Sequence, residues 1–410
     1  MASFSIALSG LTAASSGLDV TANNIANANT VGFKESRAEF ADVYASGAVN
    51  LNTSVVGEGV RLAATAQQFN QGNITTTSSN LDLAISGDGF FTLKDASGVV
   101  YSRNGQFQEN SSGNVVSATG QALQVYPPLV NGGFNTGTLA DLNLQTAQSA
   151  PLATSTGSVI LNLPANSVAP TVTPFDPTNS QSYNQSTSTT VYDSLGNAYP
   201  ATFFFVQTAT PNVWNTYLTV NGTQVGGAQP LGFSPTGAVA SPPTIAGAGL
   251  TFNGYTPPGG ASPMNLNFNF GSTTQYGAQF GVTSITQNGY ATGQLSTVAI
   301  DPSGVVSAVY TNGRSTQLGQ LALANFPNPQ GLKQLGDTNW SETFTSGNVV
   351  QGTAASAGFG SIQSGALESS NVDLTTELVN MITAQRAFQA NAQVVTTSNQ
   401  LSQTVINMAH

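Results

Sequence analysis

The side chains that most often perform catalysis are scarce in this 410-residue chain. The one histidine, His410, is the last residue, so a Ser-His-Asp triad or a histidine metal site would have to be built on a fraying chain end. Asp82, Asp88 and Asp95 are close enough in sequence for hydrolysis by paired carboxylates, but "GDG" and "DASG" are turn sequences that explain Asp88 and Asp95 structurally. Cysteine is absent, which excludes thiolate chemistry and disulfide bonds. We therefore expect no catalytic residue, no metal site and no cofactor.

Charged residues make up only 6% of the chain, against about 25% in an ordinary soluble domain, and the formal net charge is -10. No Lys or Arg lies between Arg103 and Arg314, so the chain lacks the clustered cations that nucleic-acid binding requires. The acids form no run and are best explained as an aid to solubility. No apolar stretch approaches the roughly 18 residues of a membrane span, and the first residues lack the basic start of a secretory signal. We expect no nucleic-acid partner, no membrane insertion and no cleaved signal peptide.

Two segments with helical periodicity lie at the two ends of the chain. In each, apolar residues recur at alternating spacings of four and three, which predicts a helix with one apolar stripe. The N-terminal stripe comprises Phe4, Leu8, Leu11, Leu18, Ala22 and Ile25, and the C-terminal stripe comprises Leu374, Leu378, Met381, Phe388, Ala392 and Val395, after which the pattern shifts to Val394, Leu401, Val405 and Met408. Such narrow stripes are stable only when packed, so we expect the two helices to pack on each other or on copies from other subunits.

The limits of the two helices are also predicted by local signals. The N-terminal helix is expected from about Ser3 to Asn29. Ser370 lies three residues ahead of Asp373 and is followed by Glu377, which predicts a capped helix start with acids near its positive end. Because each helix needs partners, we expect the ends to fold as the chain polymerises.

The residues between the two helical segments are expected to form β-structure. Turn sequences such as "NG", "NSSGN" and "DPSG" separate short apolar runs such as "GFFTL" and "ATFFFV", which is the pattern of hairpins. The fold class is therefore mixed: paired N- and C-terminal helices, coiled-coil-like, with nested, mainly antiparallel β domains inserted between them. The expected ranges are 1–30 and 366–410 for a terminal helical inner domain, 31–72 and 363–365 for an extended connector, 73–147 and 290–362 for the first β domain, and 148–289 for an inserted outer β domain.

Four stretches resemble the bacterial flagellar rod, hook and hook-associated proteins, which form one family of axial proteins. They are "ANNIANANTVGFK", "NLDLAISGDGFF", "YSRNGQFQENSSGNVVSATGQAL" and "GALESSNVDLTTELVNMITAQRAFQANAQVV", and they occur in the order of the family. The residues that carry the two terminal motifs are Asn23, Asn24, Asn27, Gly32, Phe33, Asn371, Asp373, Gln385, Arg386 and Asn391.

The large insert distinguishes branches of this family. Distal rod proteins share all four stretches but are shorter and lack a large inserted domain. "TVYDSLGNAYPATFFFV" and "TSITQNGYATGQLSTVAIDPSGVV" are similar to the hook branch. The resemblance thus favours the hook branch, with a distal rod or other axial protein as the alternative.

The resemblance implies a structural subunit that polymerises helically into a short, curved, hollow tube. This tube links rod to filament as a universal joint, lies outside the cell, and is exported by the flagellar type III apparatus without a cleaved signal. The implied partners are copies of the chain itself, the distal rod protein, the hook-filament junction protein, the hook assembly cap and the export apparatus. The two stripes are the expected assembly residues.

A tube that passes unfolded protein would explain why the terminal helices carry amides rather than charges. Charged walls would bind and stall passing chains, whereas amides hydrate without holding them. We expect Asn29 and Gly32 to end the helix, with Gly32 left-handed, and Asn23 and Asn24 to contact other subunits. Two other classes fit less well: a secreted β-rich adhesin would not need terminal stripes, and a β-helical polysaccharide lyase would show a regular repeat.

Overall fold

The computed structural model describes residues 2–43, 57–144, 148–241 and 249–408, so His410 lies outside the described residues. The described residues form two α-helices, two 3₁₀ helices (η1, Ser180–Ser182, and η2, Pro329–Gly331) and 28 β-strands. The chain divides into two compact units, which are considered separately. Unit 1 comprises Met1–Gln145, Thr297–Ala308 and Thr316–His410, and unit 2 comprises Thr146–Ser296 and Val309–Ser315.

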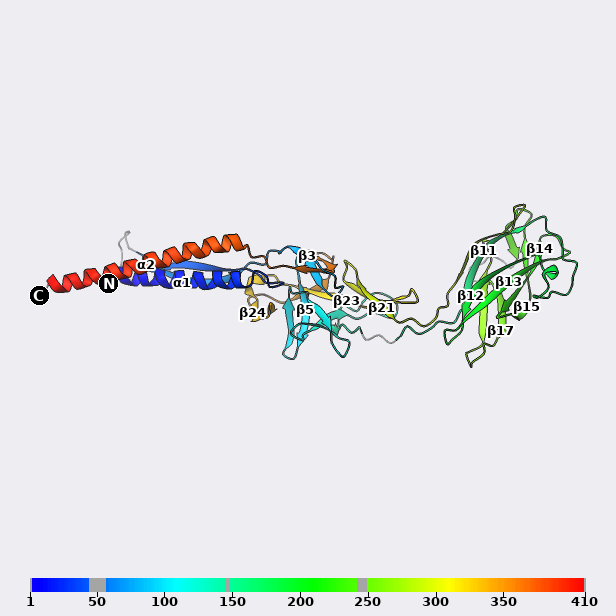
Figure 1. Cartoon of the computed structure of the whole chain (residues 1–410), viewed down its shortest axis with the longest axis horizontal. Helices are drawn as coiled ribbons and strands as arrows, with labels where there is room; N and C mark the ends of the chain where they lie inside the picture. Colours follow the sequence, from blue (N-terminus) through cyan, green and yellow to red (C-terminus); the bar gives the residue numbers. More distant parts are fainter. Residues whose placement is uncertain (1, 44–56, 145–147, 242–248, 409–410) are drawn as a thin grey trace. The chain divides into compact units, whose positions relative to one another are not determined.

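The terminal helices of unit 1 are α1 (Ala2–Ala26) and α2 (Leu374–Met408), and they lie side by side (Figure 1). The predicted fold class is confirmed, because paired N- and C-terminal helices flank antiparallel β-structure. The sequence placed the end of the first helix at Asn29, but α1 ends at Ala26, where backbone turns through Asn27 follow.

The predicted capped start of the C-terminal helix at Ser370 is wrong by several residues. The helix begins at Leu374 because the side chain of Asp373 caps it: Asp373 Oδ1 accepts hydrogen bonds from the backbone N–H groups of Thr375 (2.8 Å) and Thr376 (3.3 Å). These bonds lower the pKa of Asp373. Ser370 instead accepts a bond from Val372 N (3.3 Å) outside the helix.

The sequence predicted residues 31–72 to be an extended connector with short helical or strand pieces, and the described part of this range contains two strands. An antiparallel hairpin, β1 (Ser36–Val43) with β2 (Gly59–Gln67), packs along α1. The register pairs Ser36 with Gln67, and a bulge follows Glu39. The hydroxyl of Ser9 on α1 accepts a hydrogen bond from Val60 N at 3.2 Å, so helix and hairpin are joined directly.

The remaining β-structure of unit 1 surrounds a core that includes Leu83, Phe91, Leu123 and Leu323, all at most 1% exposed. The predicted "DASG" turn is present, since Asp95 Oδ1 accepts bonds from Ser97 N (2.6 Å) and Gly98 N (2.9 Å). The strands outside the hairpin and unit 2's sheets are β3 (Ile74–Thr76), β4 (Leu83–Ser86), β5 (Phe90–Asp95), β6 (Gly98–Ser102), β7 (Phe107–Glu109), β8 (Val115–Ser117), β9 (Ala122–Tyr126), β10 (Ala140–Asp141), β21 (Leu295–Ile300), β22 (Val305–Tyr310), β23 (Ser315–Asn325), β24 (Lys333–Gly336), β25 (Asn339–Ser341), β26 (Val350–Thr353), β27 (Ser361–Ser364) and β28 (Ala366–Glu368).

Unit 2 consists of two sheets that share one core. The first sheet contains β11 (Thr156–Pro164), β17 (Leu250–Tyr255), β18 (Met264–Asn269), β19 (Thr274–Tyr276) and β20 (Gly281–Gln287), and the second contains β12 (Gln185–Tyr192), β13 (Ala198–Gln207), β14 (Val213–Val220), β15 (Thr223–Phe233) and β16 (Val239–Ser241). The fully buried Phe203 of the "ATFFFV" run meets Phe268 edge-on at 4.9 Å and Phe270 at 5.7 Å. This aromatic contact between the sheets holds unit 2 together.

The tight turn in "TVYDSLG" is organised by one buried acid, Asp193, which is 0% exposed. Its carboxylate accepts bonds from the backbone N–H groups of Leu195 (2.8 Å) and Asn197 (2.9 Å), from Asn197 Nδ2 (3.0 Å) and from Tyr199 OH (3.2 Å). Burial alone would raise the pKa of Asp193, but the hydrogen bonds outweigh it and lower this pKa.

Replacing Phe203 by Ala should lower the free energy of unfolding of unit 2 by about 3–5 kcal/mol, because a large buried ring is lost and a cavity remains. The matched control is Val168→Ala, in the same unit but 78% exposed, which should change little. Urea unfolding in a Trp340→Phe background, where Trp214 reports on unit 2, measures this. Equal unfolding midpoints for the two variants would contradict the shared core.

Replacing Asp193 by Asn should cost about 1–3 kcal/mol of stability near pH 7, since buried donors lose their charged acceptor. The folded pKa lies below the unfolded value of about 3.9, so the advantage of the native acid is present above that value. It should shrink as pH falls through the folded pKa, where the native carboxylate also takes up a proton. Urea unfolding of both proteins at a series of pH values checks this, and a difference independent of pH would refute it.

Candidate functional site

Three of the sequence motifs meet at one buried group of charges. Lys34 ends "ANNIANANTVGFK", Arg103 lies in "YSRNGQF", and Glu368 lies in "GALESSN". In a chain with so few charges, these three side chains are only 1%, 4% and 0% exposed. We refer to them as the Lys34–Glu368–Arg103 cluster.

Glu368 is the centre of this cluster. Its Oε1 atom accepts hydrogen bonds from Lys34 Nζ at 2.7 Å and from the backbone N–H of Gly72 at 2.8 Å. Its Oε2 atom accepts a bond from Arg103 Nη1 at 3.2 Å. Both carboxylate oxygens are therefore paired, and their partners come from three separate segments of the chain.

The two cations also bind backbone carbonyls, which extends the cluster to neighbouring segments. Lys34 Nζ donates to Asn70 O at 2.8 Å, and Arg103 Nη2 donates to Gly87 O at 2.9 Å. The Arg103 guanidinium also lies over the ring of Phe90, 5.4 Å from its centre. The "NLDLAISGDGFF" motif, which contains Gly87 and Phe90, is thereby connected to the same cluster.

Burial is the dominant electrostatic influence on both cations. It lowers the pKa of Lys34, with the neighbouring Arg103 adding to the effect and Glu368 opposing it. It also lowers the pKa of Arg103, again against the attraction of Glu368. Removing the single acid would leave two cations away from water without a counter-charge, which is strongly unfavourable.

Gly32 brings the N-terminal motif close enough for this cluster to form. Its φ angle of +71° is the left-handed conformation that the sequence predicted, and its N–H donates to Glu368 O at 2.9 Å. A Cβ atom at this position would lie 2.5 Å from Asn104 N and 2.7 Å from the carbonyl carbon of Arg103. Only glycine fits here without displacing backbone.

Two further asparagines of the family motifs fasten the helices to the hairpin. Asn24 is 1% exposed, and its amide group binds both backbone groups of Ser36, accepting from N at 2.9 Å and donating to O at 2.7 Å. Asn371 accepts from Glu35 N at 2.7 Å and donates to Gln68 O at 2.8 Å. The sequence did not indicate these intrachain roles, and a contact with another subunit stays a prediction for Asn23 and Asn24.

The predicted stripes are only partly covered in the single chain. Leu11, Leu18, Ile25, Met381, Phe388 and Val395 are half-buried, whereas Phe4, Leu8, Leu374, Leu378 and Leu401 are exposed, and the side chain of Val405 lies outside the described residues. Of the remaining motif residues, Phe33 is buried, Asn27 and Asn391 are half-buried, and Asn23, Gln385 and Arg386 are exposed. Neither helix among the described residues is long and apolar enough to cross a membrane.

A face of small residues, which the stripe analysis missed, turns α1 toward α2 and the hairpin. It comprises Ala7, Gly10, Ala14, Gly17, Thr21 and Asn24. Each except Ala14 precedes a stripe residue by one position, and Ala14 precedes Ser15, the polar gap in the stripe, which places this face about 100° around the helix from the stripe. A Cβ atom on Gly10 would lie 2.9 Å from Asn391 Oδ1, so small side chains let the helices approach closely. Their regular spacing of three and four is the sequence signal that could have revealed this face.

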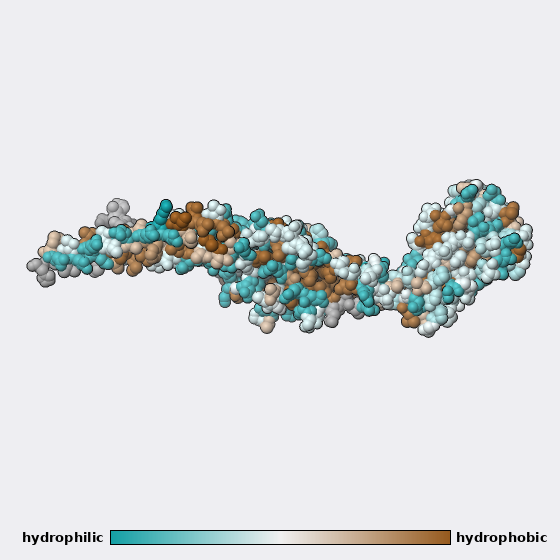
Figure 2. Space-filling view, in the orientation of Figure 1, coloured by the Kyte–Doolittle hydropathy of each residue, from teal (hydrophilic) through white to brown (hydrophobic). Residues whose placement is uncertain are grey.

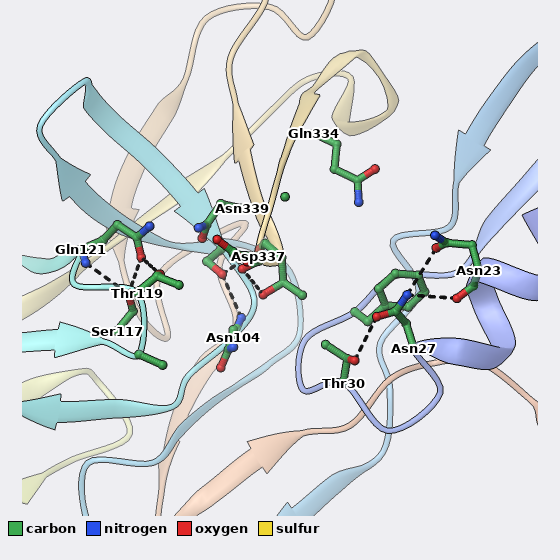
Figure 3. Close-up of a pocket in the computed structure, with 15 residues that line it drawn as sticks. Asn23, Asn27, Thr30, Asn104, Ser117, Thr119, Gln121, Gln334, Asp337 and Asn339 are labelled. Atoms are coloured by element: carbon green, nitrogen blue, oxygen red, sulfur yellow. Dashed lines mark hydrogen bonds between the residues drawn. The ribbon is translucent and has the colours of Figure 1, made fainter.

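A pocket of about 420 Å³ in unit 1 is lined largely by residues with polar side chains. Figure 3 shows Asn23, Asn27 and Thr30 on one side and Ser117 and Gln121 on the other. The Asn27 side chain is held locally, donating to Asn23 O at 3.0 Å and accepting from Thr30 Oγ1 at 3.1 Å. Within the described residues, no group of three or more His, Cys, Asp or Glu side chains is arranged to hold a metal.

Four segments of the chain match known protein families. Residues 4–34 match the flagella basal body rod protein, residues 84–173 the D1 domain of the flagellar hook protein FlgE/F/G, residues 162–290 the D2 domain of the flagellar basal body protein FlaE, and residues 363–408 the C-terminal segment of the flagellar basal body rod FlgEFG protein.

Relatives match over nearly their whole length. The flagellar hook protein FlgE of Escherichia coli K12 is 39% identical, with 99% of each chain covered. FlgE of Salmonella typhimurium LT2 is 40% identical, with 99% of this chain and 100% of the relative covered. This chain belongs to the flagellar hook protein family. The crystal structure of Helicobacter pylori flagellar hook protein FlgE2 has a similar fold, with a TM-score of 0.52 at 13% identity over 72% of this chain and 100% of that one.

Each member of the cluster lies in a different family match. Lys34 lies at the end of the rod protein match, Arg103 in the D1 match and Glu368 in the C-terminal match. The Lys34–Glu368–Arg103 cluster thus joins three family segments that are far apart in sequence. It fixes the chain after α1 and the chain before α2 to the same β domain, and we call this connection through Lys34, Glu368 and Arg103 the junction.

Replacing Glu368 by Gln should lower the free energy of unfolding of unit 1 by about 3–5 kcal/mol, because the two buried cations lose their counter-charge. The control is Glu39→Gln, which removes the exposed ion pair with Arg37 (3.0 Å, side chains 44% and 63% exposed) and should cost less than about 1 kcal/mol. Urea unfolding in a Trp214→Phe background, where Trp340 reports on unit 1, measures both. Similar losses for the two variants would show that the cluster does not hold the junction.

Proposed function

We propose that this hook family protein is the structural axial subunit that polymerises with copies of itself into the hollow, curved flagellar hook. In this proposal the hook is a flexible universal joint that transmits torque from rod to filament and passes exported subunits through its bore. The terminal helices, residues 1–30 and 366–410, form the inner layer of the tube. The insert, residues 148–289, forms an outer domain. The near full-length similarity to hook proteins supports this assignment.

The observation that carries the proposal is the row of large apolar side chains left exposed on helices that are already paired. Leu8 is 49% exposed, Leu374 44%, Leu378 46% and Leu401 62%. Figure 2 shows apolar surface gathered over the beginning of α2. Apolar surface gathered on one side of a molecule in this way usually marks a protein interface. Copies of the same helices are the natural partners, because folding alone does not cover these residues.

The junction suits a subunit that must transmit torque. A force applied to the inner helices reaches the first β domain only through the chain segments that connect them. The Lys34–Glu368–Arg103 cluster holds those segments to one another with short bonds, 2.7 Å and 3.2 Å between charged atoms. We infer that the inner helices and the first β domain turn together, and that bending takes place elsewhere in the subunit.

The surface of the insert suits contacts that slide as the tube bends. Between residues 149 and 289 the charged residues are Asp176 and Asp193, and Asp193 is buried in its own turn. Ion pairs would favour discrete positions, whereas hydroxyl and amide surfaces give weak, interchangeable contacts. We infer that neighbouring outer domains move past one another with little resistance.

The further partners are inferred from the family. The distal rod protein, the hook-filament junction protein and the hook assembly cap would meet the ends of the growing tube. The flagellar type III apparatus would export the chain without a cleaved signal. The absence of cysteine is compatible with passage in an unfolded state, since no disulfide can mispair on the way.

Replacing Leu378 by Asp should block polymerisation, because a charge would enter an apolar interface between helices. The monomer should remain folded, since this side chain is 46% exposed in the single chain. Leu335→Asp is the matched control, with the same change at a leucine that is 48% exposed in the first β domain. Sedimentation and electron microscopy of the concentrated proteins measure assembly, and thermal unfolding monitors the monomer. Normal tubes from the Leu378 variant would contradict assembly through the helices.

A further inference from the structure

A groove of about 570 Å³ runs between α1, the β1 strand and α2 in unit 1. Small residues form much of its wall, among them Gly10 and Ala14 on α1 and Ala384 and Ala387 on α2. A cavity of this volume could accept a long side chain from outside. The groove is distinct from the Lys34–Glu368–Arg103 cluster, whose members are not among its lining residues.

One buried acid in the wall of this groove lacks a full set of partners. Glu377 is 3% exposed, and its Oε1 atom accepts a hydrogen bond from Asn380 Nδ2 at 3.2 Å. Its Oε2 atom is buried and has no hydrogen-bond partner within the described residues. An unpaired buried carboxylate oxygen is costly, so a donor that reaches it would be strongly favoured.

The surroundings of Glu377 increase the demand for a positive charge. Glu35 also lines the groove, and its pKa is raised by burial and by the negative charge of Glu377. Arg37 lines the groove as well, but it is paired with Glu39 at 3.0 Å and its side chain is 63% exposed. The chain thus places two acids at the groove, and the nearby Arg37, which partly offsets the raised pKa of Glu35, forms its ion pair with Glu39.

The complementary charge is present on the opposite side of α2. Among the 35 residues of this helix, the charged ones are Glu377 and Arg386. Arg386 is exposed and forms no salt bridge within the described residues. Nine residues correspond to about two and a half helical turns, so the two side chains project from opposite faces, about 13.5 Å apart along the axis. They cannot pair within one helix.

We propose that Arg386 of a second copy of this chain enters the groove and pairs with Glu377. The inference rests on the proposed polymerisation and adds the contact that sets the register of neighbouring α2 helices. Each copy offers an acid on one face and a base on the other, so the contact is head-to-tail. Contacts of this type do not close on themselves in pairs and continue into open helical polymers.

Another acid on the helices that Arg386 could meet is Asp19 on α1, which is exposed. An exposed pair of this kind contributes little, because both charges are already well solvated. Glu377 is buried and has an unused oxygen, so pairing there gains a bond that water does not supply. The groove therefore favours Glu377 as the partner of Arg386.

Charge exchange tests the pairing in the full chain. Glu377→Arg and Arg386→Glu should each raise the concentration needed for polymerisation by more than about tenfold, and the double exchange E377R/R386E should recover most of the loss. Lys333→Gln, at an exposed cation on β24 that does not line the groove, should leave this concentration unchanged. Failure of the double exchange to recover, or an equal loss from Lys333→Gln, would overturn the pairing.

Crosslinking gives a second readout that uses smaller side chains. The chain has no cysteine, and a disulfide needs Cα atoms within about 7 Å, so E377C/R386C cannot form a bond within one helix. Treatment of polymers of this variant with a short bifunctional thiol reagent, which spans the distance that the arginine side chain covered, should give a ladder of multimers, whereas Glu377→Cys alone should give none. Polymers that yield no ladder, or dimers from the single variant, would overturn the proposal while leaving the hook assignment intact. A native chain that never polymerises would instead refute the proposed function.

Discussion

The structure depends on the burial of one carboxylate. Glu368 is removed from water, and a buried charge of this kind is tolerated only when several donors of suitable geometry surround it. Those donors are Lys34, Arg103 and the N–H of Gly72. The segment that follows α1, the segment of the first β domain that contains Arg103, and the segment that precedes α2 must therefore all be in place together. Glu368 thereby connects segments of the subunit that are far apart in sequence.

The terminal helices divide their residues between contacts inside the chain and surface left for other copies. The small residues of α1, with Gly10 against Asn391, allow close packing inside the chain, whereas larger side chains such as Leu378 on α2 remain partly exposed. A helix that packs fully on its neighbour in the same chain would have nothing left for other copies. Because charges are few on both helices, apolar burial sets the strength of association, and the isolated Glu377 and Arg386 are left to set its register.

Local patterns in the sequence predicted the two helices and the β-structure between them, but they did not predict the β1–β2 hairpin or the long-range contacts of the cluster. The spacing of four and three predicted both helices, and the "DASG" turn followed from its residue types. The start of α2 was misplaced because Ser370 and Asp373 are both good caps, and only geometry selects Asp373. The link between Lys34 and Glu368 spans 334 residues, and no periodicity in one segment can reveal a partner so distant. The scarcity of charge was an available signal, since a lone Lys and Glu inside apolar motifs require partners.

Hydrogen exchange of the native monomer tests most directly whether the cluster ties the helix ends to the first β domain. The N–H of Gly72 binds Glu368 Oε1 and the N–H of Gly32 binds Glu368 O, so both report on the junction. Our account predicts that these two amides exchange only when the first β domain unfolds, with the same free energy of opening as amides in the core of β5. Fast exchange at Gly32 and Gly72 while β5 stays protected would show that the junction opens independently, and would contradict the account.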